Sequence, residues 1–371
     1  MRTRVIQVRS PDQVAPAAAE GAAALRDGKL VGFATETVYG IAALATNAGT
    51  MERLREIESR PKRPFSVHLA GPDEVGRYVS GPPAEAKRLI RKAWPGPVTL
   101  LLPTEGRLAD EKLQAAGMSD VLCSGGYIGL RCPKGDVCQA MLAAVPGPVV
   151  APSANLAGTP SPRAADDVLS ALDGRIDLLI DTGPTELGQD STIVRFDRAG
   201  WRILRQGVIE ERTIRRLLSH TILFVCTGNT CRSPMAEGLA RRMLARRWGV
   251  SPSQLEEKGV EVLSAGTWAS DGAPASPEAI RAAKTFGTDT SKHRSRKLTT
   301  ELINQADLVL CMTAEHAEDV RRMVPAAAAK TELLDPLADI RDPLSGGADA
   351  YRETARRIER ALASRLSKEE L

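Results

Sequence analysis

A cysteine and an arginine stand close together in the sequence, in an arrangement that could carry phosphate chemistry. The run is Cys226-Thr-Gly-Asn-Thr-Cys-Arg232-Ser-Pro. The apolar residues 222–225 precede it and predict a buried parallel strand, and the helix-forming residues 235–248 follow it. A loop between a strand and a helix N-terminus directs backbone N–H groups and the positive end of the helix dipole to one point. We therefore expect an anion-binding loop with Cys226 at its base.

Each residue type in this loop suits a step of phosphoryl transfer. The positive potential should lower the pKa of the Cys226 thiol and make it a nucleophile. Arg232 can bind an oxyanion through two parallel hydrogen bonds. Gly228 and Asn229 tolerate left-handed backbone, and Ser233 is placed to cap the following helix. A buried structural cysteine is the alternative, which the accompanying Arg and Ser disfavour.

Composition is that of globular protein. With 371 residues, 43% of them hydrophobic and 26% charged, the chain should form two domains. We recognise no signal peptide and no apolar run long enough to span a membrane. The six cysteines have neither disulfide-framework nor zinc-knuckle spacing, so we expect a reducing, cytoplasmic location and no metal site in the protein. The net charge of +4 gives no independent argument for nucleic acid.

The second half of the chain alternates between apolar and helical patterns. Strands are predicted at 222–225, 260–264, 308–312 and 332–334, and helices at 234–248, 276–286, 315–323 and 348–366. This alternation predicts an α/β domain with a doubly wound, parallel, four-stranded sheet. Sites in such sheets lie beyond the carboxyl ends of the strands, which is where Cys226 falls.

Phosphate transfer from an amine or phenol also needs an acid that protonates the leaving group. Asp342, followed by proline, lies in a loop between the last predicted strand and the last helix, whereas Asp335, also followed by proline, ends a strand. The loop position favours Asp342 as the proton donor.

In the first half, small polar and cationic residues follow a series of short apolar strands. They are Thr35, His68, Arg131, Ser153, Asn155, Ser191 and Arg205, and a proline-bounded basic segment adds Arg60, Lys62 and Arg63. If the strands deliver these groups to one edge of a sheet, the site suits a nucleotide and a small zwitterion. Neither a Walker lysine motif nor Gly-x-Gly-x-x-Gly is present.

The order of these segments, over residues 5–209, resembles the threonylcarbamoyl-AMP synthase family, the YrdC-like domain. The resemblance implies a twisted mixed sheet with a concave, positively charged cavity. It also implies an enzyme that joins L-threonine, bicarbonate and ATP, which carries Mg²⁺, into threonylcarbamoyl-AMP, and a tRNA-modification partner that takes this product. Direct tRNA binding is left open. By position, threonine would be bound by Thr35, His68, Arg131, Ser153 and Ser191, and ATP by Arg60, Asn155 and Arg205.

The same segment departs from the family pattern. Glu58 stands where the family usually has a lysine, which Lys62 or Arg63 would have to replace. A non-catalytic nucleotide- or RNA-binding module is therefore the alternative for the first half, expected over residues 1–211. A short charged segment, 210–218, predicts a helix that joins it to a second domain at 219–371.

From His220 onward the chain resembles the low-molecular-weight protein tyrosine phosphatase family. The resemblance implies that Cys226 forms a phosphocysteine, Arg232 holds the phosphate and Asp342 is the acid. Ser233 would hydrogen-bond the sulfur and Asn229 would brace the loop, which Thr227, Gly228, Thr230 and Cys231 complete.

Thr230 bears on the substrate, because tyrosine-specific members usually carry isoleucine there. The loop resembles the protein-arginine-phosphatase branch, which implies a phosphoprotein substrate modified on arginine. A protein tyrosine phosphatase remains the alternative. A thioredoxin-coupled arsenate reductase is disfavoured, because Glu318 stands where a cysteine partner of Cys311 would be expected.

Overall fold

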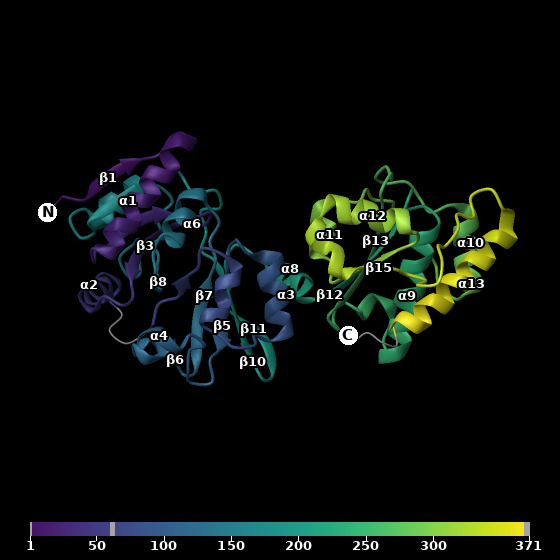
Figure 1. Ribbon diagram of the computed structural model, residues 1–371, viewed down its shortest axis with the longest axis horizontal. Coiled ribbons are helices and arrows are strands. Elements are labelled where there is room, and N and C mark those ends of the chain that lie inside the picture. The colour runs from purple at the N-terminus through teal and green to yellow at the C-terminus, as the bar shows by residue number, and fades with distance from the viewer. Residues whose placement is uncertain (1, 60–63, 367–371) are drawn as a thin grey trace. The chain divides into compact units, whose positions relative to one another are not determined.

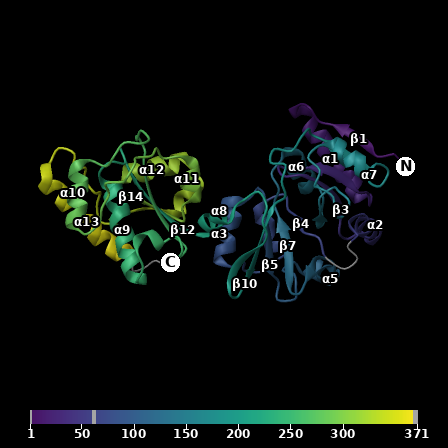
Figure 2. The ribbon, with the colours of Figure 1, turned by 180° about the vertical axis from the view of Figure 1, so that it is seen from behind.

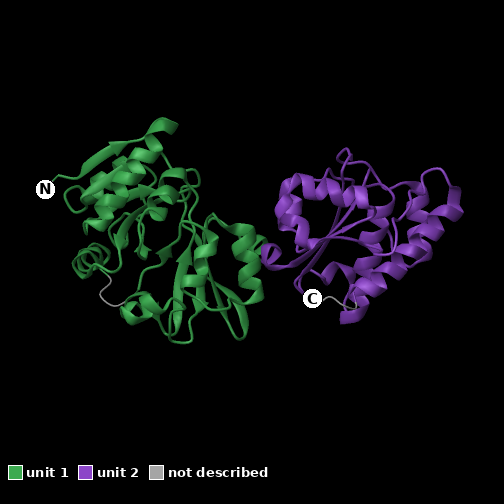
Figure 3. Ribbon diagram, viewed as in Figure 1, with its two compact units in different colours: residues 1–214 green, residues 215–371 purple. Residues whose placement is uncertain are grey.

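The structure, a computed structural model, describes residues 2–59 and 64–366. It divides into two compact units, residues 1–214 and 215–371 (Figure 3). Each unit is an α/β structure with its own sheet, so the predicted two-domain α/β architecture is confirmed.

The first unit is built on one mixed sheet. Its strand order is β1 (Arg4–Gln7), β9 (Leu178–Asp181), β2 (Val31–Ala34), β3 (Tyr39–Leu44), β8 (Val149–Val150), β4 (Val67–His68), β7 (Tyr127–Arg131), β5 (Val98–Pro103), β10 (Thr192–Asp197) and β11 (Gly200–Arg205), and β6 (Cys123–Ser124) pairs with β7. Antiparallel pairing links β2 to β3, β3 to β8 and β8 to β4, while β4 and β7 are parallel. Consequently β2 and β7 run in opposite directions. The site residues Thr35, which follows β2, and Arg131, at the end of β7, are nevertheless in contact.

Helices cover this sheet. They are α1 (Val14–Arg26), α2 (Ala48–Glu58), α3 (Ala84–Ala93), α4 (Glu111–Ala115), α5 (Met118–Leu122), α6 (Asp136–Ala143) and α7 (Ala165–Leu172). The alanine-rich α1 lies beside α6, and Gly21 permits close packing, because a Cβ there would meet the Met141 sulfur at 2.7 Å.

Strand β3 is absent from the predicted elements. Its residues are almost uniformly apolar and buried, so they lack the alternation that marks a half-buried strand. The sequence suggests that Gly40 ends a turn, yet it lies within β3. Glycine suits this position because a Cβ there would lie only 3.1 Å from the Pro152 carbonyl oxygen.

The second unit contains the predicted parallel four-stranded sheet. The order is β13 (Val260–Gly266), β12 (His220–Cys226), β14 (Leu308–Cys311) and β15 (Thr331–Leu333), and every pairing is parallel. The first strand in the sequence, β12, lies between the next two. The chain therefore crosses to opposite sides after β12, and a cleft for a ligand is expected at its carboxyl end.

Helices lie on both faces of this sheet (Figures 1 and 2). On one face α9 (Arg232–Trp248), α10 (Pro277–Thr285) and α13 (Gly347–Leu366) share a core with Ile222 and Phe224. On the other, α11 (Thr300–Gln305) and α12 (Ala314–Met323) pack with Leu223 and Val225. The alternating apolar residues of β12 thus serve two cores.

The N-cap of helix α9 lies two residues before the predicted cap. Cys231 is at its N-cap position without a side-chain capping bond, so the prediction of Ser233 as the cap is wrong. A further helix, α8 (Glu211–Leu218), occupies the charged segment between the sheets. Among the described helices none combines the length and apolar character needed to cross a bilayer.

Candidate functional site

The loop between β12 and α9 lies tightly against β13. A Cβ at Gly266 of β13 would come within 2.4 Å of the Thr227 carbonyl oxygen and 2.9 Å of the Asn229 nitrogen, so only glycine fits there. Asn229 has φ of +52°, whereas Gly228 is outside the left-handed region. The predicted left-handed turn therefore depends on Asn229 alone.

A hydrogen-bond network fixes the Cys226 sulfur. The Ser233 hydroxyl oxygen lies 2.8 Å from the sulfur, and the Asn229 backbone N–H donates to the sulfur at 3.3 Å. The Asn229 side-chain amide donates to the hydroxyl oxygens of Ser233, at 2.8 Å, and Ser264, at 2.9 Å. Because Ser233 accepts this bond, its own proton is free to point at the sulfur. The network thus favours a sulfur that carries negative charge.

Burial opposes that charge. Cys226 is 2% exposed, and burial raises the pKa of its thiol, while the hydrogen bond from Ser233 and the Arg232 charge lower it to a smaller extent. The prediction of a lowered pKa is not met by this arrangement.

Arg232 binds groups from two segments, its own loop and the loop that contains residues 340–342. Its guanidinium donates to the Ile340 carbonyl and the Thr227 hydroxyl, both at 3.2 Å, and forms an ion pair with Asp342. The Arg232 side chain is 5% exposed and that of Asp342 is 44% exposed. Asp342 therefore lies at the open side of the loop.

The competing carboxylate, Asp335, is engaged elsewhere. It accepts hydrogen bonds from Arg357 of α13, at 2.8 Å, and from the Leu337 N–H, at 3.1 Å. Burial raises its pKa, but the bond from Arg357 and the other hydrogen bonds outweigh burial and lower it overall. Asp342, not Asp335, contacts the loop arginine.

Two residues that the sequence analysis missed lie against the loop. His316 of α12 places Nε2 2.9 Å from the Thr227 hydroxyl and Nδ1 2.7 Å from that of Thr313. Trp268 is 83% exposed, and its backbone N–H donates to the Thr227 carbonyl at 3.0 Å. A histidine two positions into a helix and a lone tryptophan carry little signal in a single sequence.

The other predicted loop residues lie around the same point. Thr230 is partly exposed, and its hydroxyl lies 3.8 Å from the buried Cys231 sulfur. The Cys231 sulfur is also 3.3 Å from the Tyr351 hydroxyl of α13.

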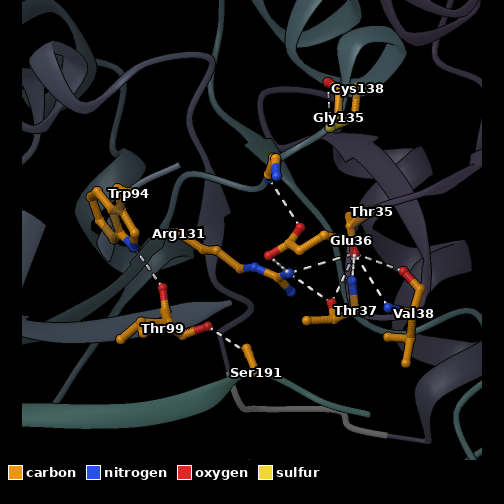
Figure 4. Close-up of polar contacts among 12 residues, drawn as sticks. Thr35, Glu36, Thr37, Val38, Trp94, Thr99, Arg131, Gly135, Cys138 and Ser191 are labelled. Atoms are coloured by element: carbon orange, nitrogen blue, oxygen red, sulfur yellow. Dashed lines mark hydrogen bonds and ion pairs between the residues drawn. The ribbon is translucent and has the colours of Figure 1, made fainter. Parts of the chain in front are cut away.

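In the first unit, Arg131 is the centre of a buried polar cluster (Figure 4). Its guanidinium donates to Glu36 at 2.9 Å, to Thr37 at 2.7 Å and to Thr35 at 3.5 Å. Arg131 and Glu36 are both less than 10% exposed, so this is a buried ion pair. The sequence analysis named Thr35 and Arg131 but missed Glu36, which reads as part of a polar turn.

His68 stands next to Arg131, because the two residues are paired in the β4–β7 register. Burial, assisted by the Arg131 charge, lowers the pKa of His68 to about 3, so the ring is neutral. Because the His68 ring is neutral, Arg131 is the positively charged group of this pair that can bind a carboxylate ligand.

Ser191 and Arg205 form a second cluster. The Ser191 hydroxyl lies 2.9 Å from that of Thr99 and accepts from Arg205 at 3.2 Å, and Arg205 pairs with Asp190 at 3.3 Å. The Asp190 carboxylate also accepts from Ser161 at 2.9 Å.

Asn155 and Asp190 line a cavity of about 680 Å³ together with Ser161 and Arg163. The Asn155 amide N–H groups donate to backbone carbonyls at 3.0 and 2.7 Å, but its buried Oδ1 has no partner among the described residues. The Asn155 Oδ1 can therefore accept a hydrogen bond from an amino group of a ligand, such as that of adenine.

The remaining predicted residues of this half are less connected. Ser153 forms an isolated bridge with Gly40, which places it beside β3. Arg60, Lys62 and Arg63 lie outside the described residues.

The carboxylates of this cavity do not favour a separate Mg²⁺ site. Asp190 is occupied by Arg205 and Ser161, and Asp167 accepts from the backbone N–H groups of residues 163 and 164. Magnesium accompanying ATP would be held chiefly by the phosphates, as is usual for this ion.

Comparisons with known proteins match the two units separately. The Sua5/YciO/YrdC family model, described as telomere recombination, matches residues 23–207, and the low molecular weight phosphotyrosine protein phosphatase model matches residues 221–370. A putative threonylcarbamoyl-AMP synthase of Mycobacterium tuberculosis is 30% identical over 218 residues, which are 58% of this chain and 95% of that protein. A protein-arginine-phosphatase of Bacillus subtilis is 38% identical over 157 residues, 40% of this chain and 97% of the relative. The chain belongs to both families.

Two further comparisons are with Sua5-type proteins. The threonylcarbamoyl-AMP synthase of B. subtilis is 35% identical over 204 residues, 55% of this chain, and the match spans only 57% of that relative. The structure of Pyrococcus abyssi Sua5 superposes with a TM-score of 0.50 at 24% identity, covering 71% of this chain and 91% of that one, which supports the fold.

Proposed function

We propose that the chain is a bifunctional enzyme: a threonylcarbamoyl-AMP synthase fused to a cysteine-dependent protein phosphatase that acts on phosphoarginine. The phosphatase assignment is supported most directly by one observation. The loop brings together a nucleophile, an oxyanion-binding arginine and a carboxylate at its open side, Cys226, Arg232 and Asp342.

The phosphatase reaction follows from these positions. The Cys226 thiolate attacks phosphorus in line, an S–P bond forms, and the bond from phosphorus to the leaving group breaks. Asp342 gives the leaving group a proton and later takes one from the water that cleaves the S–P bond. Ser233 stabilises the departing thiolate through its hydroxyl proton.

Substrate binding also explains the Arg232–Asp342 pair. A phosphoryl group competes for the same guanidinium, and its two negative charges make it the stronger partner. The Asp342 carboxyl then leaves the ion pair with Arg232 and can turn toward the leaving group. Binding therefore assembles the acid as well as the anion site.

Thr230 and Trp268 favour phosphoarginine as the substrate. A threonine hydroxyl can hydrogen-bond a guanidinium, and an exposed indole face beside the loop can stack on it. A phenol gains less from the hydroxyl. The arginine-phosphatase relative supports the same assignment.

The decisive measurement is the ratio of kcat/KM for phosphoarginine and phosphotyrosine peptides in wild type and Thr230→Ile. We expect wild type to prefer phosphoarginine and the variant to shift toward phosphotyrosine by about tenfold, as one lost polar contact is worth about 1–2 kcal/mol. A wild-type preference for phosphotyrosine that Thr230→Ile leaves unchanged would instead establish the tyrosine phosphatase.

The synthase assignment is supported by the Arg131 cluster and by the cavity at Asn155. Arg131 supplies a buried cation for the threonine carboxylate, and Thr35, Ser153 and Ser191 supply hydroxyls. ATP would occupy the cavity at Asn155 with Arg205 near its phosphates. The product would pass to a tRNA-modification partner.

Purified protein given ATP, Mg²⁺, bicarbonate and L-threonine should release pyrophosphate in a threonine-dependent way. Arg131→Ala should raise the threonine KM at least tenfold, because it removes the carboxylate partner. Arg198→Ala, in the exposed turn between β10 and β11, is the control and should behave as wild type. Release that is absent, or independent of threonine, would favour the non-catalytic module.

A further inference from the structure

The phosphatase unit contains a cavity lined by several cationic side chains, next to residues that contact the catalytic loop. It has a volume of about 480 Å³ and lies between α9 and the segment 287–296. Its lining includes Arg241 of α9 and, from the segment, Thr290, Lys292, Arg294 and Arg296. Gly238 allows the segment to approach the helix, because a Cβ there would meet Thr288 and Thr290 atoms at 3.0 Å.

The positive charge of this cavity is only partly balanced within the protein. Arg242 pairs with Glu359. Two carboxylates also line the cavity: Glu237 accepts from Ser264 at 2.7 Å, and Asp289 accepts from the Ser291 N–H at 2.9 Å. The guanidinium groups of Arg241 and Arg296 have no hydrogen bond or ion pair among the described residues. Two donor groups with fixed positive charge are therefore available to a ligand.

Thr290 gives an independent indication of a ligand. It is 6% exposed, and its buried hydroxyl has no partner within the described part of the chain. The Arg241 Nε is likewise buried and unpartnered. A buried polar group without a hydrogen bond costs about 1–3 kcal/mol, so such groups are rare unless something binds them.

We propose that this cavity binds a small oxyanion of the phosphate or pyrophosphate class. Guanidinium N–H groups and a hydroxyl are the donors that phosphoryl oxygens accept from, and the exposed Lys292 and Arg294 lie at the wall of the cavity. Phosphate would come from the phosphatase reaction and pyrophosphate from the synthase reaction. Those two sources rest on the proposed function, but the binding site does not.

Two residues of the cavity wall also support the catalytic loop. The His293 Nε2 donates to the Asn229 carbonyl at 2.8 Å, and Glu237 accepts from Ser264, which in turn accepts from Asn229. Asn229 holds Ser233 and the Cys226 sulfur. An anion in the cavity therefore acts on the geometry of the nucleophile and should change kcat, whereas an anion in the loop itself competes with substrate and changes KM alone.

Hydrogen exchange on the full chain separates the two anion sites. Titration with pyrophosphate, and in a second arm with phosphate, should protect amides of segment 287–296 as well as those of the catalytic loop. The arm that saturates at the lower concentration identifies the preferred anion. Protection of 287–296 persists even if the synthase half has no activity, so the two proposals can fail separately.

Three variants make the test specific. Thr290→Val keeps the shape of the side chain and removes only the hydroxyl, so the concentration for half-protection of 287–296 should rise about fivefold or more with no loss of stability. Arg241→Gln should raise it about tenfold or more and abolish the anion effect on kcat. Arg281→Gln, an exposed arginine on α10, should match wild type. No protection of 287–296 by either anion, or equal protection in wild type, Thr290→Val and Arg241→Gln, would overturn the proposal.

Discussion

At the scale of single residues, the chemistry of the loop depends on the direction of hydrogen bonds. The Asn229 amide donates to Ser233, which leaves the Ser233 proton for the sulfur of Cys226. Burial nevertheless raises the pKa of that thiol. Thiolate formation therefore depends on the hydrogen bonds from the Ser233 hydroxyl and the Asn229 N–H. These groups stabilise the sulfur, so another residue must protonate the leaving group.

Asp342→Asn tests that donor. We expect kcat/KM to fall about 10²–10⁴-fold for substrates with basic leaving groups and much less for p-nitrophenyl phosphate, whose leaving group needs little protonation. The measurement is a leaving-group series with aryl phosphates and a phosphoarginine peptide.

Asp335→Asn is the matched control, because Asp335 is bound to Arg357. It should show the wild-type dependence on the leaving group. If Asp335→Asn, rather than Asp342→Asn, steepens that dependence, the acid has been misassigned.

At the scale of elements, the first turn of α12, which follows β14, contacts the catalytic loop through the His316 side chain. Arg232 donates to the Thr227 hydroxyl, which keeps its own proton for the His316 Nε2, and in that tautomer the Nδ1–H faces Thr313. This chain of bonds requires a neutral ring. Burial and the nearby Arg232 charge lower the pKa of His316 to about 4, which agrees with it.

The shifted pKa makes stability depend on pH. An unfolded histidine titrates near 6.5, so between pH 6.5 and 4 the unfolded state binds more protons than the folded state. The free energy of unfolding of the second unit should therefore fall as the pH falls through this range, by roughly 2–3 kcal/mol from His316 alone.

Pulse proteolysis in urea, with the units resolved by fragment size, measures this dependence. His316→Gln keeps a hydrogen-bonding side chain but cannot titrate, so its unfolding midpoint should fall less between pH 6.5 and 4. Parallel pH profiles for the variant and wild type would contradict the assignment.

All the strands and most of the helices of the second unit follow from its sequence, because alternation of apolar strands and amphipathic helices leaves few topologies, but the short α11 is not among the predicted elements. The cap of α9 does not follow, since Ser233 looks like a capping residue yet donates toward a sulfur seven positions earlier. In the first unit, β3 and the Glu36–Arg131 pair depend on contacts between distant segments. Periodicity reports which face of an element is buried, but not which buried charges meet.

At the scale of the whole chain, each unit has a hydrophobic core of its own. Val31, Phe33 and Ile180 belong to a core of the first unit, and Phe224 and Leu310 to one of the second. The predicted end of the first domain, residue 211, is the first residue of α8, so truncating the chain just after it would interrupt a helix. Substitutions in the full chain are the better way to separate the activities.

We therefore expect the two proposed activities to be separable by single substitutions. Cys226→Ser should abolish phosphate release and leave threonine-dependent pyrophosphate release within about twofold of wild type. Arg131→Ala should raise the threonine KM for pyrophosphate release and leave phosphate release within about twofold of wild type. Both reactions are measured on the same preparations. Loss of both activities in either variant would show that the units depend on one another.

Both proposed anion-binding arginines already hold a carboxylate of their own chain, Glu36 on Arg131 and Asp342 on Arg232. A tethered carboxylate acts at a high effective concentration, so dilute monovalent anions such as chloride compete poorly with it. Only a ligand that brings further contacts, or a second negative charge, displaces it. These internal carboxylates thus keep common monovalent anions from binding at either arginine. A substrate must bind the arginine more favourably than the internal carboxylate does.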